Sequence, residues 1–240
     1  MEKASLAHII FALVYTLIWI AIFFARKDLR RKIVQASILG GILLMVIEPF
    51  WALKDYWHPP YILGKDGFFV EDFIFGFLMG GIGISIYDVV FSKRNEKTEP
   101  RRAKISIFLM IASILSMPVF CNGLGINSIF VSSFYALIIS AIIVYIRRDL
   151  LIPSIISGLL MLALIIPTYA FLFNVISTDY WDKYWFLANT KYDVRILGHI
   201  PLTELLWYFS WGCVAGAYEF ATGRTKSDYV VTNTTKPTDS

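Results

Sequence analysis

The sequence predicts an all-α membrane protein with about seven transmembrane helices, arranged as two parallel three-helix repeats joined by a linker helix. The first observation behind this prediction is the composition, with 57% hydrophobic residues and a mean hydropathy of +0.63. The second is a series of long apolar stretches separated by short polar ones, and the third is an internal repeat. A crossing needs about 20 residues, so the 240 residues leave no room for a separate soluble domain.

Each apolar stretch is long enough to satisfy its backbone hydrogen bonds inside one helix, as lipid requires. The first stretch is expected to be a retained helix and not a signal peptide, because no basic segment precedes it and no small-residue cleavage motif follows it. The predicted helices cover residues 6–25, 33–53, 69–91, 105–120, 128–146, 151–176 and 202–222.

Lysine and arginine residues gather in alternate connecting segments, which fixes an expected orientation. They lie at residues 26–32, 93–104 and 147–148 and in the tail after residue 223, whereas the opposite loops are rich in Trp and Tyr. Because positive charge accumulates on the cytoplasmic side, these segments should be cytoplasmic. We therefore expect a multi-pass protein of the cell membrane with its N-terminus outside and its C-terminus in the cytoplasm.

The internal repeat is weak but keeps its order along the chain, and it suggests the organisation of the domains. Two three-helix units of the same orientation need one extra crossing between them, which helix 105–120 supplies. The matched segments are 26–29 with 147–150, 55–57 with 179–181, 62–64 with 196–198, and the acids Asp72 and Glu204, each followed by glycine eight residues on. The predicted units are a first repeat at 1–95, a loop and linker helix at 96–127, a second repeat at 128–223, and a disordered cytoplasmic tail at 224–240.

Charge and motifs exclude several classes of protein. The net charge of +4 comes from short basic clusters between apolar stretches, which suits lipid headgroups and not nucleic acid. Cys121 and Cys213 show no spacing typical of a metal site, and no Gly-x-Gly-x-x-Gly motif indicates a bound flavin or nicotinamide, so no cofactor or metal is expected. A retinal protein needs a lysine in its last helix, where 202–222 has none, and a prenyltransferase needs Asp-rich motifs that are absent.

Acidic residues within or beside the apolar spans are the candidate functional residues, because ionisable groups there are costly. Glu48, Glu71, Asp72 and Glu204 all fall toward the outer leaflet. No lysine or arginine is expected inside these helices, so buried carboxyl groups should hold their protons. The alternative for the acids that begin helices is favourable interaction with the helix dipole. Two further acids, Asp88 and Glu219, border the cytoplasmic side, where the wet headgroup zone is the simpler expectation.

Two short segments carry a resemblance to a known family. Residues 197–209 read Leu-Gly-His-Ile-Pro-Leu-Thr-Glu-Leu-Leu-Trp-Tyr-Phe, and residues 67–75 read Gly-Phe-Phe-Val-Glu-Asp-Phe-Ile-Phe. They resemble the lycopene cyclase domain of the small membrane-embedded carotenoid cyclases, whose signature is Pro-x-Glu-Glu followed by aromatic residues at a helix start. The tandem members of that family hold two three-helix units in one chain. This chain departs from the signature at Thr203, which stands in place of the first acid, and it has no proline before the Glu71–Asp72 pair.

The resemblance implies a lycopene β-cyclase-type isomerase, an intramolecular lyase of carotenoid biosynthesis that closes the linear ends of a carotenoid into rings without net redox change. The ligand would be an apolar polyene or another isoprenoid lipid in the bilayer. Glu71, Asp72 and Glu204 are the expected catalytic acids, with Glu48 in reserve. The alternative is a non-catalytic carotenoid- or lipid-binding protein of the same fold, and the sequence leaves both this choice and the oligomeric state open.

Overall fold

A computed structural model describes the chain except for residues 1, 64–67, 92–94, 99 and 227–240. It is mostly helical, which confirms the prediction of an all-α membrane protein. Six helical segments of the described residues are long and apolar enough to cross a bilayer: Lys3–Ala25, Lys27–Asp55, Val70–Phe91, Ala103–Gly123, Ser128–Ile146 and Arg148–Ile176. The segment expected as a seventh span, 202–222, is helical but divided into three pieces. A count of seven spans therefore stays a prediction.

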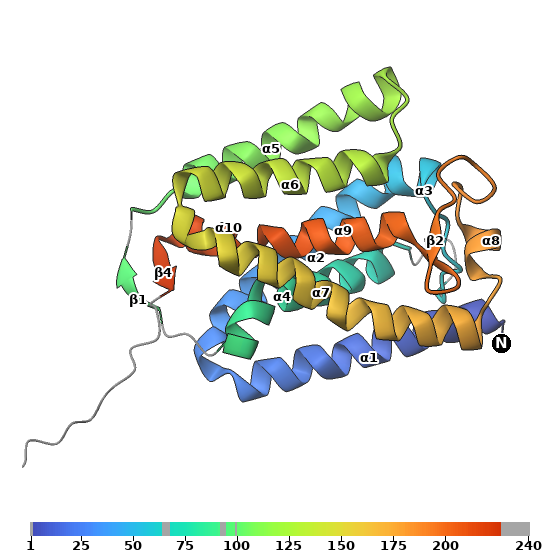
Figure 1. The fold of residues 1–240 in the computed structure, drawn as a ribbon, viewed down its shortest axis with the longest axis horizontal. Coiled ribbons are helices and arrows are strands. Elements are labelled where there is room, and N and C mark those ends of the chain that lie inside the picture. Colours follow the sequence, from blue (N-terminus) through green and yellow to red (C-terminus); the bar gives the residue numbers. More distant parts are fainter. Residues whose placement is uncertain (1, 64–67, 92–94, 99, 227–240) are drawn as a thin grey trace, which may run out of the picture.

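The elements follow the predicted order along the chain (Figure 1). The first half contains α1 (Lys3–Ala25), a 3₁₀ turn (Lys27–Leu29), α2 (Arg30–Ile47), a π turn (Glu48–Ala52), α3 (Leu53–Asp55) and α4 (Phe68–Phe91). Then come β1 (Asn95–Thr98), α5 (Ala103–Pro118) with a π turn (Val119–Gly123), α6 (Ser128–Ile146), a 3₁₀ turn (Arg148–Leu150), α7 (Leu151–Phe171) with a π turn (Leu172–Ile176), and α8 (Tyr180–Tyr184). The chain continues through β2 (Arg195–Ile196), β3 (Ile200–Pro201), α9 (Leu202–Cys213), a 3₁₀ turn (Val214–Gly216), α10 (Ala217–Thr222) and β4 (Arg224–Lys226).

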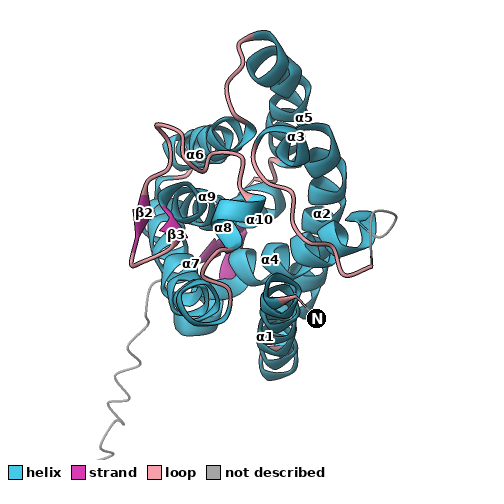
Figure 2. Cartoon of the chain, turned by 90° about the vertical axis from the view of Figure 1, so that its right-hand side faces the viewer, coloured by secondary structure: helices cyan, strands magenta, loops and turns pink. Residues whose placement is uncertain are grey.

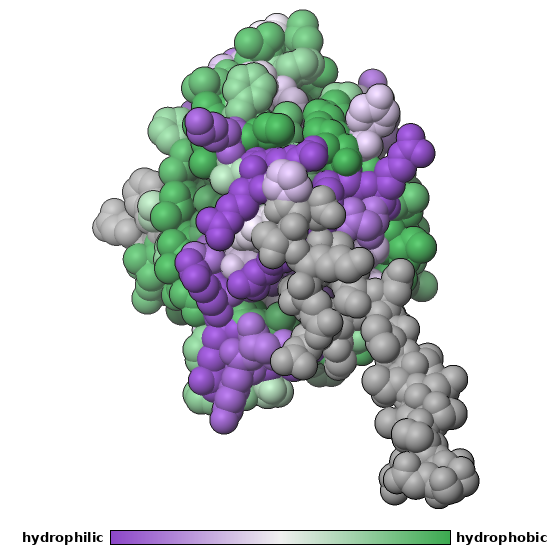
Figure 3. Space-filling view, turned by 90° about the vertical axis from the view of Figure 1, so that its left-hand side faces the viewer, coloured by the Kyte–Doolittle hydropathy of each residue, from purple (hydrophilic) through white to green (hydrophobic). Residues whose placement is uncertain are grey.

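The long helices alternate in direction, so that the basic segments meet at one end of the bundle. α1, α4, α6 and α9 run from the end that carries α8 to the end that carries β1 and β4, and α2, α5 and α7 return (Figure 1). Figure 3 looks at this second end, where hydrophilic side chains form a band flanked by hydrophobic surface. We call it the basic end; it contains Arg26, Lys27, Arg102, Arg147 and Arg148. The opposite end is covered by α8 and the β2–β3 hairpin (Figure 2).

Local geometry recurs in the two predicted repeats. Arg26 ends α1 with φ −112° and ψ 74°, and Arg147 ends α6 with φ −129° and ψ 80°. Each arginine donates two hydrogen bonds to the aspartate two residues on, Asp28 or Asp149, and each is followed by a 3₁₀ turn and a long helix that ends in a π turn. This recurrence supports a duplication, which remains a prediction until the halves are superposed.

Glycines bring α4 against α2, and α9 against α7. A Cβ atom on Gly40 would lie 2.5 Å from the carbonyl oxygen of Gly76, and one on Gly80 would lie 2.6 Å from the carbonyl oxygen of Ala36. In the second half, a Cβ atom on Gly212 would lie 2.7 Å from the Cα atom of Gly158. Both helix pairs thus touch backbone to backbone, which requires glycine at these positions.

One expectation about charge is wrong. Asp88 and Glu219 were expected in the wet headgroup zone with no basic residue inside the helices, but their side chains are fully buried, 0% exposed, around the Lys32 ammonium group. Lys32 Nζ lies 2.7 Å from Asp88 Oδ2 and 2.5 Å from Glu219 Oε1. Lys32 belongs to the basic run that follows α1, and only the packing of α2 reveals that this one member points inward. The three residues tie α2 and α4 to α10.

The predicted linker helix and the described part of the predicted tail each make few contacts with the rest of the bundle. α5 lies at the edge of the bundle beside α6 (Figure 1), and Met117 is its one buried residue. The tail expected at 224–240 begins with a short strand, because β4 pairs antiparallel with β1. The rest of that predicted disordered tail, residues 227–240, lies outside the described residues.

Candidate active site

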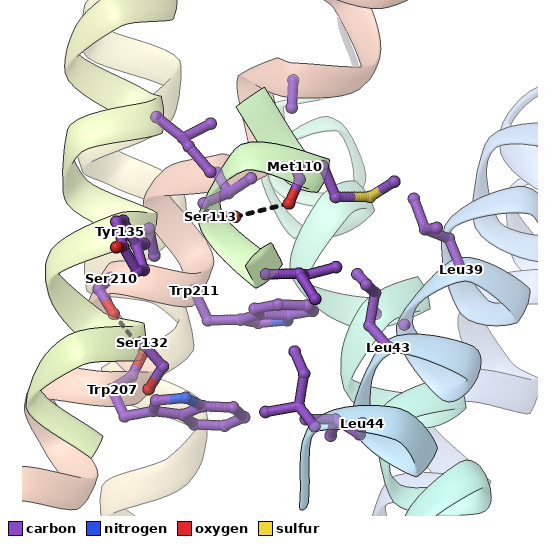
Figure 4. Close-up of a pocket in the computed structure, with 18 of the residues that line it drawn as sticks. Leu39, Leu43, Leu44, Met110, Ser113, Ser132, Tyr135, Trp207, Ser210 and Trp211 are labelled. Atoms are coloured by element: carbon purple, nitrogen blue, oxygen red, sulfur yellow. Dashed lines mark hydrogen bonds between the residues drawn. The ribbon is translucent and has the colours of Figure 1, made fainter. Parts of the chain in front are cut away.

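An elongated cavity of about 490 Å³ lies between α2, α5, α6 and α9. Its lining is mainly aliphatic and aromatic, with side chains from all four helices facing one another across the space (Figure 4). Along α6 the lining extends from Ser128 to Ile143, which at 1.5 Å per residue is about 22 Å. The cavity therefore runs through much of the thickness that these helices would span, and two carboxyl groups, Glu48 and Glu204, stand at its end away from the basic end.

Glu48 reaches the cavity because α2 changes its winding there. Pro49 cannot donate a backbone hydrogen bond, and the helix continues as a π turn from Glu48 to Ala52. π turns of this kind occur often at functional sites. The Glu48 side chain is only 5% exposed and lines the cavity.

Asp72 lies directly behind Glu48. It is in the first turns of α4 and is 3% exposed, and its buried carboxyl group neighbours that of Glu48. The Tyr61 hydroxyl donates to Asp72 Oδ1 at 3.0 Å. Burial, followed by the neighbouring Asp72 charge, raises the pKa of Tyr61 well above its ordinary value, so this hydroxyl keeps its proton. Two neighbouring buried carboxyl groups are costly to ionise together, so Glu48 and Asp72 form an acid pair that is suited to sharing a proton.

Glu204 occupies a different environment on the other side of the cavity. It lies in the first turn of α9, is 8% exposed, and accepts hydrogen bonds on both oxygens, from Tyr56 at 2.6 Å and from Tyr169 at 2.8 Å. Tyr169 also contacts the Tyr208 hydroxyl at 3.0 Å. The two hydroxyl donors fix both oxygens of this carboxyl group in place as acceptors. The cavity end therefore holds Glu48, with Asp72 next to it, and a second carboxyl group that accepts two hydroxyl donors.

Thr203, where the family signature has an acid, is buried beside this carboxylate. Its hydroxyl lies 3.1 Å from that of Tyr56 and extends the hydrogen-bond network around Glu204. The second half thus contributes Glu204 to the cavity, and the first half contributes Glu48, with Asp72 next to it outside the lining. This end of the cavity therefore has acids from both halves of the chain, even though Thr203 replaces the first acid of the signature.

Aromatic side chains form the wall next to the carboxyl groups. Trp207 and Trp211, on α9, stack with ring centroids 5.8 Å apart and an interplanar angle of 10°, and Figure 4 shows both rings extending into the cavity. Phe75 of α4 stacks on Trp207 with an interplanar angle of 16°. No lysine or arginine is among the described residues that line the cavity. Negative charge together with aromatic faces is suited to a cation that forms inside the cavity.

The structure brings together three of the four sequence candidates, Glu48, Asp72 and Glu204. The fourth, Glu71, points elsewhere: its carboxylate accepts a hydrogen bond from the backbone N–H of Leu63 at 2.7 Å. The tyrosines around Glu204 were not predicted from the sequence, although Tyr56 belongs to an Asp-Tyr-Trp segment that recurs at residues 179–181. Among the described residues, no group of three or more His, Cys, Asp or Glu side chains could hold a metal ion.

The comparison with protein families agrees with the resemblance. Residues 127–220 match the model of the lycopene cyclase family. The match runs from the start of α6 into α10 and includes Tyr169 and Glu204. No curated protein and no solved structure matches the chain. The family supports a membrane protein of carotenoid biosynthesis, while the tandem form, with the first half as a second copy, is not shown by this match.

Proposed function

We propose that this chain, whose second half matches the model of the lycopene cyclase family, catalyses acid-driven cyclisation of the linear end groups of a carotenoid such as lycopene. The observation that carries the proposal is the pairing of two kinds of acid at one end of an apolar cavity. The buried, neighbouring acids Glu48 and Asp72 would give a proton, and Glu204, fixed by two tyrosine hydroxyls, would receive one.

Glu48 is the proposed proton donor, because it lines the cavity and Asp72 does not. Its proton would add to the terminal double bond of the polyene and leave a carbocation on the more substituted carbon. Both carboxyl groups would then be ionised until a proton is restored, and the Tyr61 hydroxyl would donate to Asp72 in this state. General acid catalysis of this kind contributes about 10²–10⁴-fold to a rate.

Ring closure would follow when the next double bond of the chain attacks the carbocation and forms a carbon–carbon bond. The new cation lies within the ring, and loss of a proton from a neighbouring carbon to Glu204 restores a double bond. One proton enters and one leaves, so the product is an isomer of the substrate. Exchange with solvent then removes the proton from Glu204 and restores one to the Glu48–Asp72 pair, which resets the site.

The aromatic wall would protect the cation during these steps. Trp207, Trp211 and Phe75 present ring faces that favour a cation and leave little room for water, which would trap it as an alcohol. The hydrogen bonds from Tyr56 and Tyr169 would keep Glu204 in place as an ionised acceptor. A protein that only stores a polyene does not require this paired arrangement of acids.

Expression in a bacterium that accumulates lycopene, followed by chromatography of the pigments, tests the proposal. Cyclic carotenoid should appear with the unaltered chain and fall about 10²-fold or more in Glu48→Gln and Glu204→Gln. Glu71→Gln is the matched control, because Glu71 neighbours Asp72 in sequence but contacts the Leu63 backbone. Lycopene that stays linear with the well-folded, unaltered chain would instead favour the non-catalytic carotenoid- or lipid-binding protein.

The topology belongs to the same proposal. The basic end would face the cytoplasm, because positive residues gather there, and the end with the carboxyl groups would face outward. The N-terminus would then lie outside and the C-terminus inside. The first and second repeats would each supply acids to one shared site, with α5 as the linker helix between them.

A further inference from the structure

The shape of the cavity indicates how a substrate would lie in it. The α2 residues that line it recur at Gln35, Leu39, Leu43 and Ile47, one helical face that ends at Glu48. From Gln35 to Glu48 this face is about 20 Å long at 1.5 Å per residue. The cavity is thus a channel parallel to the helices, suited to an extended chain and not to a compact ligand.

One side of the channel opens between α2 and α5. Leu39 on α2 and Ile107 on α5 both line the cavity, yet they are 45% and 51% exposed. Figure 4 shows Leu39 and Leu43 facing Met110 across the open space. We call this opening the α2–α5 seam. Its exposed rims are apolar, so in a bilayer it would face lipid tails and not water.

The two ends of the channel differ chemically. One end has Glu48 and Glu204, whereas the other is lined by Gln35 and Tyr218, which hydrogen bond to each other at 3.1 Å between α2 and α10. The described residues that line this second end include no carboxylic acid. Proton transfer to the substrate can therefore take place at only one end of the channel.

We propose that a linear polyene enters sideways from the bilayer through the α2–α5 seam and lies lengthwise, with the end group to be cyclised at Glu48 and Glu204 and the rest of the chain extending past Gln35 and Tyr218. This inference rests on the proposed function. It makes the far half of the channel the part that holds the chain beyond the reacting end group. It also means that each binding event closes one ring, so a second ring requires release and reversed rebinding.

Blocking the channel at mid-length tests the inference. Ala136 on α6 lines the cavity eight residues from Ser128, about 12 Å along the helix, and Ala141 on the same helix is exposed and does not line it. Ala136→Trp should lower conversion of lycopene by about tenfold or more, because the indole would occupy the middle of the channel. A truncated polyene with the same linear end group, too short to reach Ala136, should still be cyclised. Ala141→Trp should leave both conversions unchanged.

Gln35→Trp provides a second variant at an exposed position, where misfolding is not expected. It should also discriminate against lycopene and spare the truncated polyene. Equal conversion of both substrates by Ala136→Trp and Gln35→Trp, or equal loss of both, would overturn the lengthwise placement. These outcomes are separate from failure of the proposed function, in which the unaltered chain would cyclise neither substrate.

The order of products gives a further readout. In a reaction limited to one turnover, a channel with one reactive end should yield only monocyclic carotenoid. When excess unlabelled lycopene is added after labelled lycopene has bound, the label should remain in the monocyclic product. Bicyclic labelled product formed without exchange would contradict a single reactive end.

Discussion

Loss of the Lys32 ammonium group should destabilise the protein far more than loss of any neighbouring positive charge. Lys32 Nζ contacts two carboxylates, Asp88 at 2.7 Å and Glu219 at 2.5 Å, and all three side chains are 0% exposed. Lys32→Met keeps the approximate length of the side chain but leaves two buried acids without their cation. Removal of one partner from a buried ion pair lowers the free energy of unfolding by about 3–5 kcal/mol. Because Lys32→Met leaves two buried acids without a cation, we expect a loss at the upper end of that range.

The assay is unfolding of the purified protein in detergent micelles or lipid bicelles, followed by helical circular dichroism against denaturant. Arg31→Met is the matched control, because Arg31 is the adjacent, exposed member of the same basic run. Arg31→Met should change the free energy of unfolding by no more than about 0.5 kcal/mol. The triple variant Lys32→Met, Asp88→Asn, Glu219→Gln should recover part of the lost stability, because it no longer buries uncompensated charge. Equal effects of Lys32→Met and Arg31→Met would refute the buried ion cluster.

Three further predictions concern the site, the helix packing and the topology. Tyr169→Phe removes one of two hydrogen-bond donors to Glu204. Because hydrogen bonds to charged groups contribute about 1.5–3 kcal/mol, cyclisation measured by pigment chromatography should fall by about ten- to hundredfold. Unchanged cyclisation would rule out a positioning role for Tyr169. Gly80→Leu places a Cβ atom 2.6 Å from the Ala36 carbonyl oxygen, so we expect loss of folded protein on size-exclusion chromatography. A normal yield of folded protein would contradict the close α2–α4 contact. In a background without native cysteines, Ser92→Cys should react with an impermeant thiol reagent from the cytoplasmic side, and Asn189→Cys should react from outside. Labelling of both cysteines from the same side would contradict the predicted topology.

Much of the helical framework could be predicted because lipid imposes it on the sequence. The expected helix at 128–146 coincides with α6, and the expected helix at 69–91 differs from α4 by one residue at its start. Long apolar runs identify such helices, since every backbone group must be paired inside the membrane. The last segment was expected as one continuous helix at 202–222, but a 3₁₀ turn at Val214–Gly216 divides it. The hydropathy of that segment does not indicate this break.

The candidate site could be predicted only in part, because it depends on which way side chains turn around each helix. Asp72 and Glu204 were marked as acids at helix starts, and the structure places both at the cavity end. Their partners come from distant parts of the chain: Tyr56 and Glu204 are 148 residues apart in sequence. Hydropathy places a residue along a helix but says little about its rotation, which here follows from the glycine contacts of α2 with α4. The same limit hid Lys32, one basic residue among several.

The proposed role of the Glu48–Asp72 pair has a direct isotopic consequence. If the acid pair donates the proton that starts ring closure, then cyclisation in heavy water should place one deuterium in each ring that forms, because the carboxyl proton exchanges with solvent before the reaction. Mass spectrometry of the cyclic product from the purified, lipid-embedded protein measures this. We predict one added deuterium per ring with the unaltered chain and with Glu71→Gln, and no cyclic product with Glu48→Gln. Cyclic product without deuterium, or undiminished cyclisation by Glu48→Gln, would contradict proton donation by this pair.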